Sequence, residues 1–207
     1  YALSLKQGLT HASANTVTGR LASGEIDGEP ISDEDFMWMF LMVITAGNET
    51  TRSGIAQGMR LLMEHPEQLL WLQDNLDKIP DAVDEMLRFN GPLISMRRTA
   101  MADVQVGSAQ IKKGDKVVLH YATVNFDEQV FGEDAHKFDV TRAARQPGLA
   151  RDLRSFGTGS HYCLGTHLAK QEMQIMFAEL LPRIRQPKLA GPVRYMRSFF
   201  LSSIREM

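Results

Sequence analysis

The sequence predicts a mainly α-helical domain with a small antiparallel β-sheet. Apolar residues at helical spacing run from Ser32 to about Met63, and two shorter helical patterns follow before residue 90. Between residues 104 and 119 the apolar period falls to two, which is typical of short hairpin strands. No repeat or linker divides the chain, so we expect residues 1–207 to belong to one domain.

Composition excludes several classes of protein. The 207 residues are 43% hydrophobic, which is enough to bury a core. A net charge of -2 provides no basic field for nucleic acid. The single cysteine, Cys163, cannot form an internal disulfide and indicates a reducing compartment. The longest apolar run, Phe36 to Ala46, is shorter than the roughly 20 residues of a membrane span. We therefore expect a cytoplasmic protein with no membrane span and no signal peptide.

The helices follow from periodicity and capping signals. The first thirty residues are polar and glycine-rich, so we expect a lead-in with one weak helix over Ala12–Leu21. Ser32 is the expected N-cap of the long helix, and three acidic residues after it suit the positive end of the helix dipole. Because apolar residues fill every face of this helix, it is predicted to be buried all round. A second helix is expected over Glu67–Leu76, and a third from Pro80 to just before Asn90.

The rest of the chain predicts short strands, a long loop and one more helix. Strands are expected at Val104–Val106, at Ile111 and at Val117–Leu119, with turns near Gly107 and Gly114. Residues 125–155 lack a lasting period and predict a long ordered loop. A helix follows from Gly165 to about Leu181, and Phe199–Leu201 predict a turn or strand.

The strongest chemical signal is the run Phe156-Gly-Thr-Gly-Ser-His-Tyr-Cys-Leu-Gly165. Its glycines permit a tight loop, and a helix begins directly behind Cys163, where the helix dipole favours a negatively charged sulfur. A lone cysteine here has four interpretations: a nucleophile, a redox sensor, a metal ligand or a small buried hydrophobe. His161 is too close along a turn to form a recognisable catalytic dyad with it.

Polar residues at the middle of the long helix are a second signal. Glu49 and Thr50 follow Gly47 inside an apolar stretch, where a carboxylate must be paired, hydrated or protonated. Thr50 or Thr51 could also divert a backbone carbonyl and open the helix locally. The alternative is a polar stripe that faces solvent.

A third signal, the spacing of Glu85 and Arg88, is weak when taken alone. Glu85 and Arg88 lie three residues apart on one predicted helix and can form an ion pair, although surface pairs at this spacing are common.

Together these motifs resemble the cytochrome P-450 haem-thiolate monooxygenases, soluble bacterial type. The order is the same: Ala-Gly-x-Glu-Thr-Thr on a long helix, Glu-x-x-Arg on a later helix, then the cysteine loop. The resemblance runs from about Ala12 to the end and covers only the C-terminal half of that family's fold. It implies a mainly α fold with a small antiparallel sheet.

The resemblance implies a role for each matching residue. Cys163 would be the thiolate ligand of the iron of haem b (iron protoporphyrin IX), with Phe156 packed beside the sulfur. Backbone N–H groups near Leu164 and Gly165 would tune its reduction potential, and Gly157 would belong to the same cofactor-binding loop. His161 and Arg98 would contact haem propionates, and Arg97 competes with Arg98 for that position.

Two further groups of residues match the family. Glu49 and Thr50 would be the acid and alcohol that serve dioxygen and proton delivery. Glu85 and Arg88 would form a structural ion-pair element with Arg142, which supports the cysteine loop.

By position in the family, a set of residues should line the substrate pocket. These residues are Val43, Ala46, Gly47, Leu93, Ile94, Ser95, Met96, Phe199 and Phe200. Nearly all are apolar, so the expected substrate is a hydrophobic small molecule of terpene, steroid or fatty-chain type. Ordinary core packing is the alternative for the two phenylalanines.

We therefore expect an enzyme that inserts one atom of dioxygen into its substrate. Its electrons would come from NAD(P)H through a ferredoxin and a ferredoxin reductase, because nothing in the sequence resembles a flavin or nicotinamide domain. The alternatives are peroxide-driven or isomerising chemistry, a non-catalytic haem sensor, and an inactive fragment. Because the family's N-terminal half has no counterpart here, we expect an incomplete haem-thiolate domain from a protein about twice as long, with the long helix partly exposed.

Overall fold

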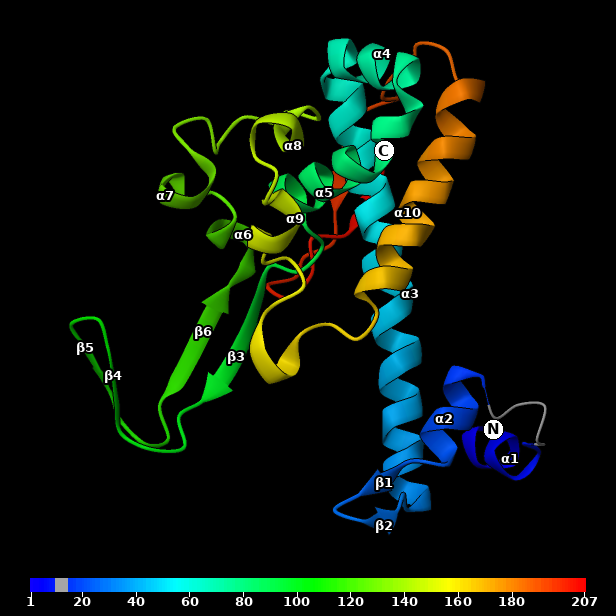
Figure 1. Ribbon diagram of the computed structural model, residues 1–207, viewed down its shortest axis with the longest axis vertical. Helices are drawn as coiled ribbons and strands as arrows, with labels where there is room; N and C mark the ends of the chain where they lie inside the picture. Colours follow the sequence, from blue (N-terminus) through cyan, green and yellow to red (C-terminus); the bar gives the residue numbers. More distant parts are fainter. Residues whose placement is uncertain (10–14) are drawn as a thin grey trace. The chain divides into compact units, whose positions relative to one another are not determined.

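The computed structural model describes residues 1–9 and 15–207 (Figure 1). The chain divides into two compact units, Tyr1–Glu49 and Thr50–Met207. Part of the helix predicted over Ala12–Leu21 lies outside the described residues.

The first unit contains more regular secondary structure than the sequence predicts for the residues before the long helix. It contains α1 (Ala2–Gln7), α2 (Val17–Ala22), the hairpin β1 (Glu25–Ile26) and β2 (Glu29–Pro30), and the first part of α3 (Asp33–Glu64). The prediction missed α1, whereas α2 coincides with the end of the weak helix it proposed. Asp27 and Gly28 both have positive φ, 54° and 84°, which is the two-residue turn that an Asp-Gly pair favours.

Helix α3 begins where its capping signal predicts. The backbone N–H of Asp35 donates to Ser32 Oγ at 3.0 Å, and Ser32 Oγ in turn donates to the Asp35 carboxylate at 2.6 Å. This reciprocal arrangement satisfies an N–H group that the first turn cannot pair internally. The helix then continues to Glu64 without interruption.

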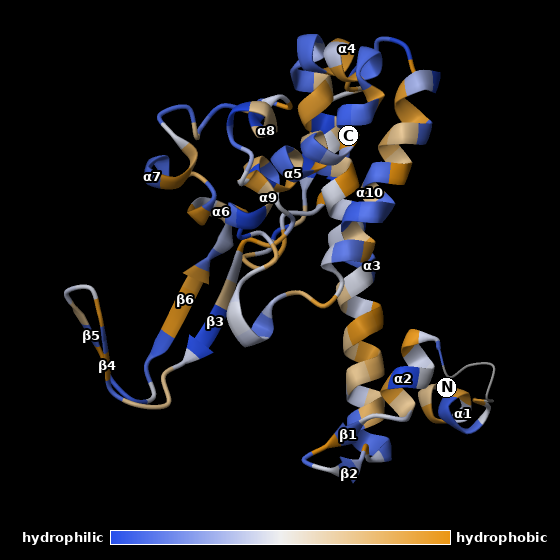
Figure 2. Cartoon of the chain, in the orientation of Figure 1, coloured by the Kyte–Doolittle hydropathy of each residue, from blue (hydrophilic) through white to orange (hydrophobic). Residues whose placement is uncertain are grey.

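The prediction that α3 is buried on every face is wrong for its first half. Figure 2 shows that this half of α3 is largely hydrophobic. Five of its large apolar side chains are exposed, namely Met37, Trp38, Leu41, Met42 and Ile44. Its second half behaves as predicted, because Leu61 and Leu62 are buried. An apolar surface of this kind marks a face that another element normally covers.

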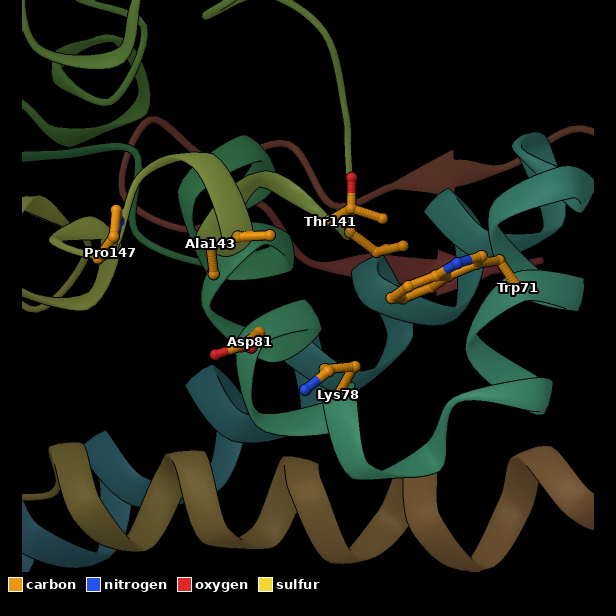
Figure 3. A pocket seen from close by; sticks show the side chains of 8 residues that line it. Trp71, Lys78, Asp81, Thr141, Ala143 and Pro147 are labelled. Atoms are coloured by element: carbon orange, nitrogen blue, oxygen red, sulfur yellow. The ribbon is translucent and has the colours of Figure 1, made fainter.

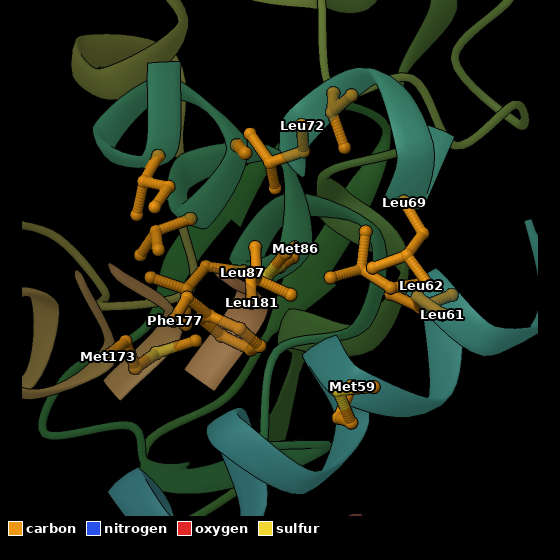
Figure 4. Close-up of a cluster of buried hydrophobic side chains, with 14 of the residues drawn as sticks. Met59, Leu61, Leu62, Leu69, Leu72, Met86, Leu87, Met173, Phe177 and Leu181 are labelled. Atoms are coloured by element: carbon orange, nitrogen blue, oxygen red, sulfur yellow. The ribbon is translucent and has the colours of Figure 1, made fainter. Parts of the chain in front are cut away.

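The second unit contains the hydrophobic core. Its helices are α4 (Pro66–Asp74), α5 (Ile79–Asn90) and α10 (Thr166–Leu180), with short 3₁₀ turns η2 (Leu76–Lys78) and η4 (Leu181–Arg183). Leucine, methionine and phenylalanine side chains from α3, α4, α5, α10 and η4 form one cluster (Figure 4). Helices α4, α5 and α10 match the predicted ranges within two residues.

Two glycines set the approach of helices to α3. A Cβ at Gly58 would lie 2.7 Å from Met86 Sδ and 2.9 Å from Phe177 Cζ. A Cβ at Gly54 would lie 3.2 Å from Met173 Sδ. Because these glycines are four residues apart, they share one helix face, and α5 and α10 pack closely against it.

The strands form small antiparallel pairs. They are β3 (Ser95–Thr99) with β6 (Lys116–His120), β4 (Val104–Val106) with β5 (Ala109–Ile111), and β7 (Arg194–Tyr195) with β8 (Ile204–Glu206). The β4–β5 hairpin turns at Gly107, as predicted. The second predicted hairpin is wrong, because β6 pairs with β3, a strand that the sequence analysis did not identify.

The segment between residues 121 and 161 is ordered by short helical turns rather than left as loop. These are α6 (Tyr121–Val124), α7 (Glu128–Phe131), α8 (Arg142–Arg145), α9 (Leu149–Asp152) and the 3₁₀ turn η3 (Gly159–His161). Across the described ranges 1–9 and 15–207, no helix combines the length and apolar character that a bilayer crossing needs.

Candidate functional site

The cysteine loop, residues 156–165, is a closed turn ahead of α10. Gly157 and Gly159 have φ of 75° and 70°, a left-handed conformation that favours glycine. The N–H of Cys163 donates to the Phe156 carbonyl at 3.0 Å and closes the loop. At its far end, Thr166 Oγ1 donates to the Cys163 carbonyl at 2.8 Å. Hydrogen bonds thus fix the cysteine on both sides.

The thiol of Cys163 is exposed, so it is not a buried hydrophobe. The neighbouring Leu164 is 84% exposed, and Gly165 is the N-cap of α10. The cysteine thus lies just before a helix N-terminus, as the sequence predicts.

The donors around Cys163 fit a haem better than a metal bound by protein alone. Among the described residues, no group of three or more His, Cys, Asp or Glu side chains could hold a metal ion. A metal bound here would therefore need its other ligands from a non-protein group. A Cβ at Gly159 would meet nothing within 4 Å, so this glycine faces open space. One thiolate and an accessible loop are what a haem with an axial cysteine requires.

The polar pair on α3 lies in unbroken helix. Glu49 and Thr50 are adjacent and half-buried, and Thr51 is buried. The local opening considered for Thr50 or Thr51 is absent, because residues 33–64 are all α-helical. Earlier on the same helix, Thr45 Oγ1 donates to the Leu41 carbonyl at 2.8 Å.

Strand β3 separates the two candidate arginines. Its alternation places Met96 and Arg98 on one face, half-buried, and the exposed Arg97 on the other. Arg98 Nη1 donates to the Arg97 carbonyl at 3.2 Å and contacts Met96 Sδ at 3.9 Å. His161 is exposed in η3 at the middle of the cysteine loop. Each strand face thus carries one predicted pocket residue: Arg98 is half-buried on the face of Met96, whereas Arg97 is exposed on the face of Ser95.

The predicted pocket residues of the second unit come together. The Ile94 N–H donates to the Phe200 carbonyl at 2.9 Å, and Ser95 Oγ donates to the Phe199 carbonyl at 2.8 Å. Leu93 bridges to Leu201. Phe199 is 86% exposed, so it is not ordinary core. In the first unit, Val43 is half-buried while Ala46 and Gly47 are exposed on α3.

A buried polar seam that the sequence analysis missed anchors this turn to α3. Ser53 Oγ lies 3.0 Å from Ser203 Oγ, and Gln57 Nε2 donates to the Ser202 carbonyl at 3.2 Å and to its Oγ at 3.0 Å. Ser53, Gln57 and Ser203 are fully buried or nearly so. The seam joins residues about 150 positions apart, and no local motif marks it.

The ion-pair residues form a buried network rather than a surface pair. Arg88 donates to both oxygens of Glu85, at 2.7 and 2.9 Å, and Arg142 Nε lies 3.2 Å from Glu85 Oε2. All three side chains are at most 1% exposed. Both arginines also donate to the Lys137 carbonyl. Two guanidiniums that share one carboxylate thus bind the segment ahead of the cysteine loop.

Two hollows in the second unit are lined by other residues. One, of about 320 Å³, is bounded by Trp71, Lys78, Asp81, Val140, Thr141, Ala143, Ala144 and Pro147 (Figure 3). The other, of about 530 Å³, is lined by Tyr195, Met196, Arg197 and Arg205. Neither is lined by a predicted site residue.

Comparison with known proteins agrees with this geometry. The family model for cytochrome P450 matches residues 13–186. Linalool 8-monooxygenase from Pseudomonas putida is 38% identical over 90% of this chain and 44% of its own length. Steroid C26-monooxygenase from Mycolicibacterium smegmatis is 34% identical over 99% of this chain and 46% of its own length.

A solved structure matches nearly the whole fold. The structure of P450 RauA, complexed with a biosynthetic intermediate of aurachin RE, superposes with a TM-score of 0.85 at 29% identity. The match covers 98% of this chain and 48% of that one. The chain therefore spans about half the length of the relatives it matches.

Proposed function

We propose a function for this chain, which belongs to the cytochrome P450 family. Its relatives include monooxygenases that share 34–38% of its residues. We propose that the complete protein is a haem-thiolate monooxygenase that inserts one oxygen atom from dioxygen into a hydrophobic small molecule. The observation that carries this proposal is the exposed thiol of Cys163, fixed by hydrogen bonds on a glycine loop just before α10.

The residues that would hold the haem are few. Cys163 would ligate the iron, Phe156, Gly157 and Gly165 would pack around the sulfur, and His161 and Arg98 would donate to the propionates. When bound, the haem would supply the activation of dioxygen.

Glu49 and Thr50 would serve proton delivery. A hydroxyl and a carboxyl adjacent on one helix can pass a proton from solvent toward a reacting oxygen. Their half-buried positions support this role, because such a pair lies between solvent and protein interior.

The substrate class follows from the proposed pocket wall. Val43, Leu93, Ile94, Met96 and Phe199 offer apolar surface, while Ala46 and Gly47 add little bulk. The names of two relatives refer to linalool and to a steroid. We propose a substrate of terpene, steroid or fatty-chain type.

The wider assignment belongs to the same proposal. Electrons would come from NAD(P)H through a ferredoxin and its reductase, and the protein would work in the cytoplasm. Residues 1–207 would be an incomplete haem-thiolate domain, the C-terminal half of the family fold. The exposed apolar side chains of α3 and the 44–46% coverage of the relatives support that view.

Coupling of electron flow to product tests the proposal. In the holoprotein supplied with a ferredoxin system, a hydrophobic substrate should increase NAD(P)H consumption, and labelled dioxygen should place one labelled atom in the product. Thr50→Ala should divert reducing equivalents to hydrogen peroxide. Thr45→Ala, an exposed position on the same helix, is the matched control. A protein that binds haem but shows no substrate-dependent consumption would instead be a haem sensor.

A further inference from the structure

An ion pair that none of the assigned roles uses lies beside the cysteine loop. Asp84 on α5 and Lys170 on α10 meet with Lys170 Nζ 2.5 Å from Asp84 Oδ1, and their side chains are only 14% and 18% exposed. Among the described residues, no donor reaches Asp84 Oδ1 with hydrogen-bond geometry. The ammonium of Lys170 is therefore the counterion of this carboxylate.

The same ammonium faces the loop. Lys170 Nζ lies 5.8 Å from the centroid of the Phe156 ring, within the range of a cation–π interaction. Phe156 is also the residue whose carbonyl accepts the N–H of Cys163 at 3.0 Å. One cation thus links helix α5, helix α10 and the hydrogen bond that closes the cysteine loop.

Packing makes this link specific. Met86 and Leu87 of α5 and Met173 and Phe177 of α10 belong to one buried cluster, so the two helices are fixed around the pair. Burial raises the pKa of Asp84, and Lys170 opposes that rise. An ammonium with a partly desolvated partner has little freedom to leave the ring, because swinging away would leave the carboxylate unpaired.

We propose that Lys170 is a positioning residue for the cysteine loop: its ammonium, oriented by Asp84, braces the Phe156 ring and keeps the Cys163 N–H bonded to the Phe156 carbonyl. This contact between Lys170 and Phe156 acts directly on the cysteine loop and does not require the haem. A second consequence rests on the proposed function, since a charge near a haem thiolate also tunes the reduction potential of the iron.

The two charges predict opposite effects on that potential. Lys170→Met removes a positive charge, which destabilises the reduced iron and lowers the reduction potential. Asp84→Asn leaves the ammonium without its counterion and raises the potential. A purely packing role would not produce shifts of opposite sign from the two variants.

The test measures amide hydrogen exchange at Cys163 in the holoprotein. Lys170→Met should exchange roughly two- to thirtyfold faster, the range that corresponds to loss of a cation–π contact. Lys170→Arg keeps the charge and should restore protection. Lys188→Met, an exposed lysine, is the control.

Other outcomes overturn the proposal. The proposal is wrong if the Cys163 amide exchanges at the wild-type rate in Lys170→Met, or if Lys170→Met and Lys170→Arg lose the same amount of protection. It is also wrong if Lys170→Met and Asp84→Asn shift the reduction potential in the same direction. If Lys170→Met does not fold, the other two variants test the proposal. Lys170→Arg must keep the protection of the Cys163 amide, and Asp84→Asn must raise the reduction potential of the iron. A wild-type protein without a thiolate-ligated haem would refute the proposed function, while the exchange comparison would still decide on the brace.

Discussion

Asn125 and Ser155 form a partly buried hydrogen bond that connects the ion-pair network to the cysteine loop. Asn125 Nδ2 donates to Ser155 Oγ at 2.8 Å, and Asn125 Oδ1 accepts the Arg154 N–H at 2.9 Å. The Asn125 carbonyl accepts from Arg88 at 2.8 Å, while Ser155 Oγ donates to the Leu87 carbonyl at 2.6 Å. Asn125, which is 2% exposed, therefore links the end of α5 with the start of the loop that carries Cys163.

Removing this link should destabilise the protein. Asn125→Ala would leave the Arg154 N–H without its acceptor in a poorly solvated position, so we expect unfolding to become easier by about 1–3 kcal/mol. Urea denaturation measures the change, and Gln171→Ala on the exposed side of α10 is the control. A loss as small as in the control would mean that the bond does not support the loop.

Glu85 should be among the most sensitive positions in the chain. Glu85→Gln would remove the carboxylate charge that pairs with two buried guanidiniums, those of Arg88 and Arg142. We expect a loss of about 3–5 kcal/mol, the range for breaking a buried ion pair by removing one partner. Glu179→Gln breaks an exposed pair with Arg183 and should cost at most about 1 kcal/mol. Similar losses in both variants would contradict a buried network.

Asp134 gives the network a pH dependence of known sign. The hydrogen bond from Arg142 lowers the pKa of Asp134 below its ordinary value of 3.8, against an opposing effect of burial. A carboxyl group whose pKa is lowered in the folded state stabilises that state when the pH is above the ordinary pKa. This stabilisation is lost as the pH falls through the folded-state pKa. The difference in unfolding free energy between wild type and Asp134→Asn should therefore shrink as the pH falls from about 5 through the ordinary value of 3.8 and below it. A difference that grows on acidification would have the wrong sign.

Much of the fold was predictable because its signals are local. The Ser32 cap, the apolar spacing of α3 and Pro80 near the start of α5 all act within a few residues of the elements they specify. Gly157 and Gly159 in the cysteine loop are also local signals, because each has a positive φ that glycine adopts without strain. Strand β3 escaped prediction because Arg97 and Arg98 interrupt its apolar pattern and its partner β6 lies about 20 residues away.

Long-range contacts explain the rest. The seam of Ser53, Gln57, Ser202 and Ser203 depends on residues about 150 positions apart, and a serine in sequence does not reveal its partner. Burial of α3 was overestimated because apolar composition shows what a helix can bury, not which element covers it. Lys170 and Asp84 carry no motif of their own, and only the packing of α5 on α10 pairs them.

The central claim is that the sulfur of Cys163 is the protein ligand of a haem iron. The spectrum of the reduced, carbon-monoxide-bound protein tests it most directly, because the position of the main haem band reports whether a thiolate ligates the iron. The wild-type protein should show the thiolate-type band, and Cys163→Ala should lose it. A thiolate-type band that persists in Cys163→Ala, or one that never forms in the haem-loaded wild type, would contradict the account.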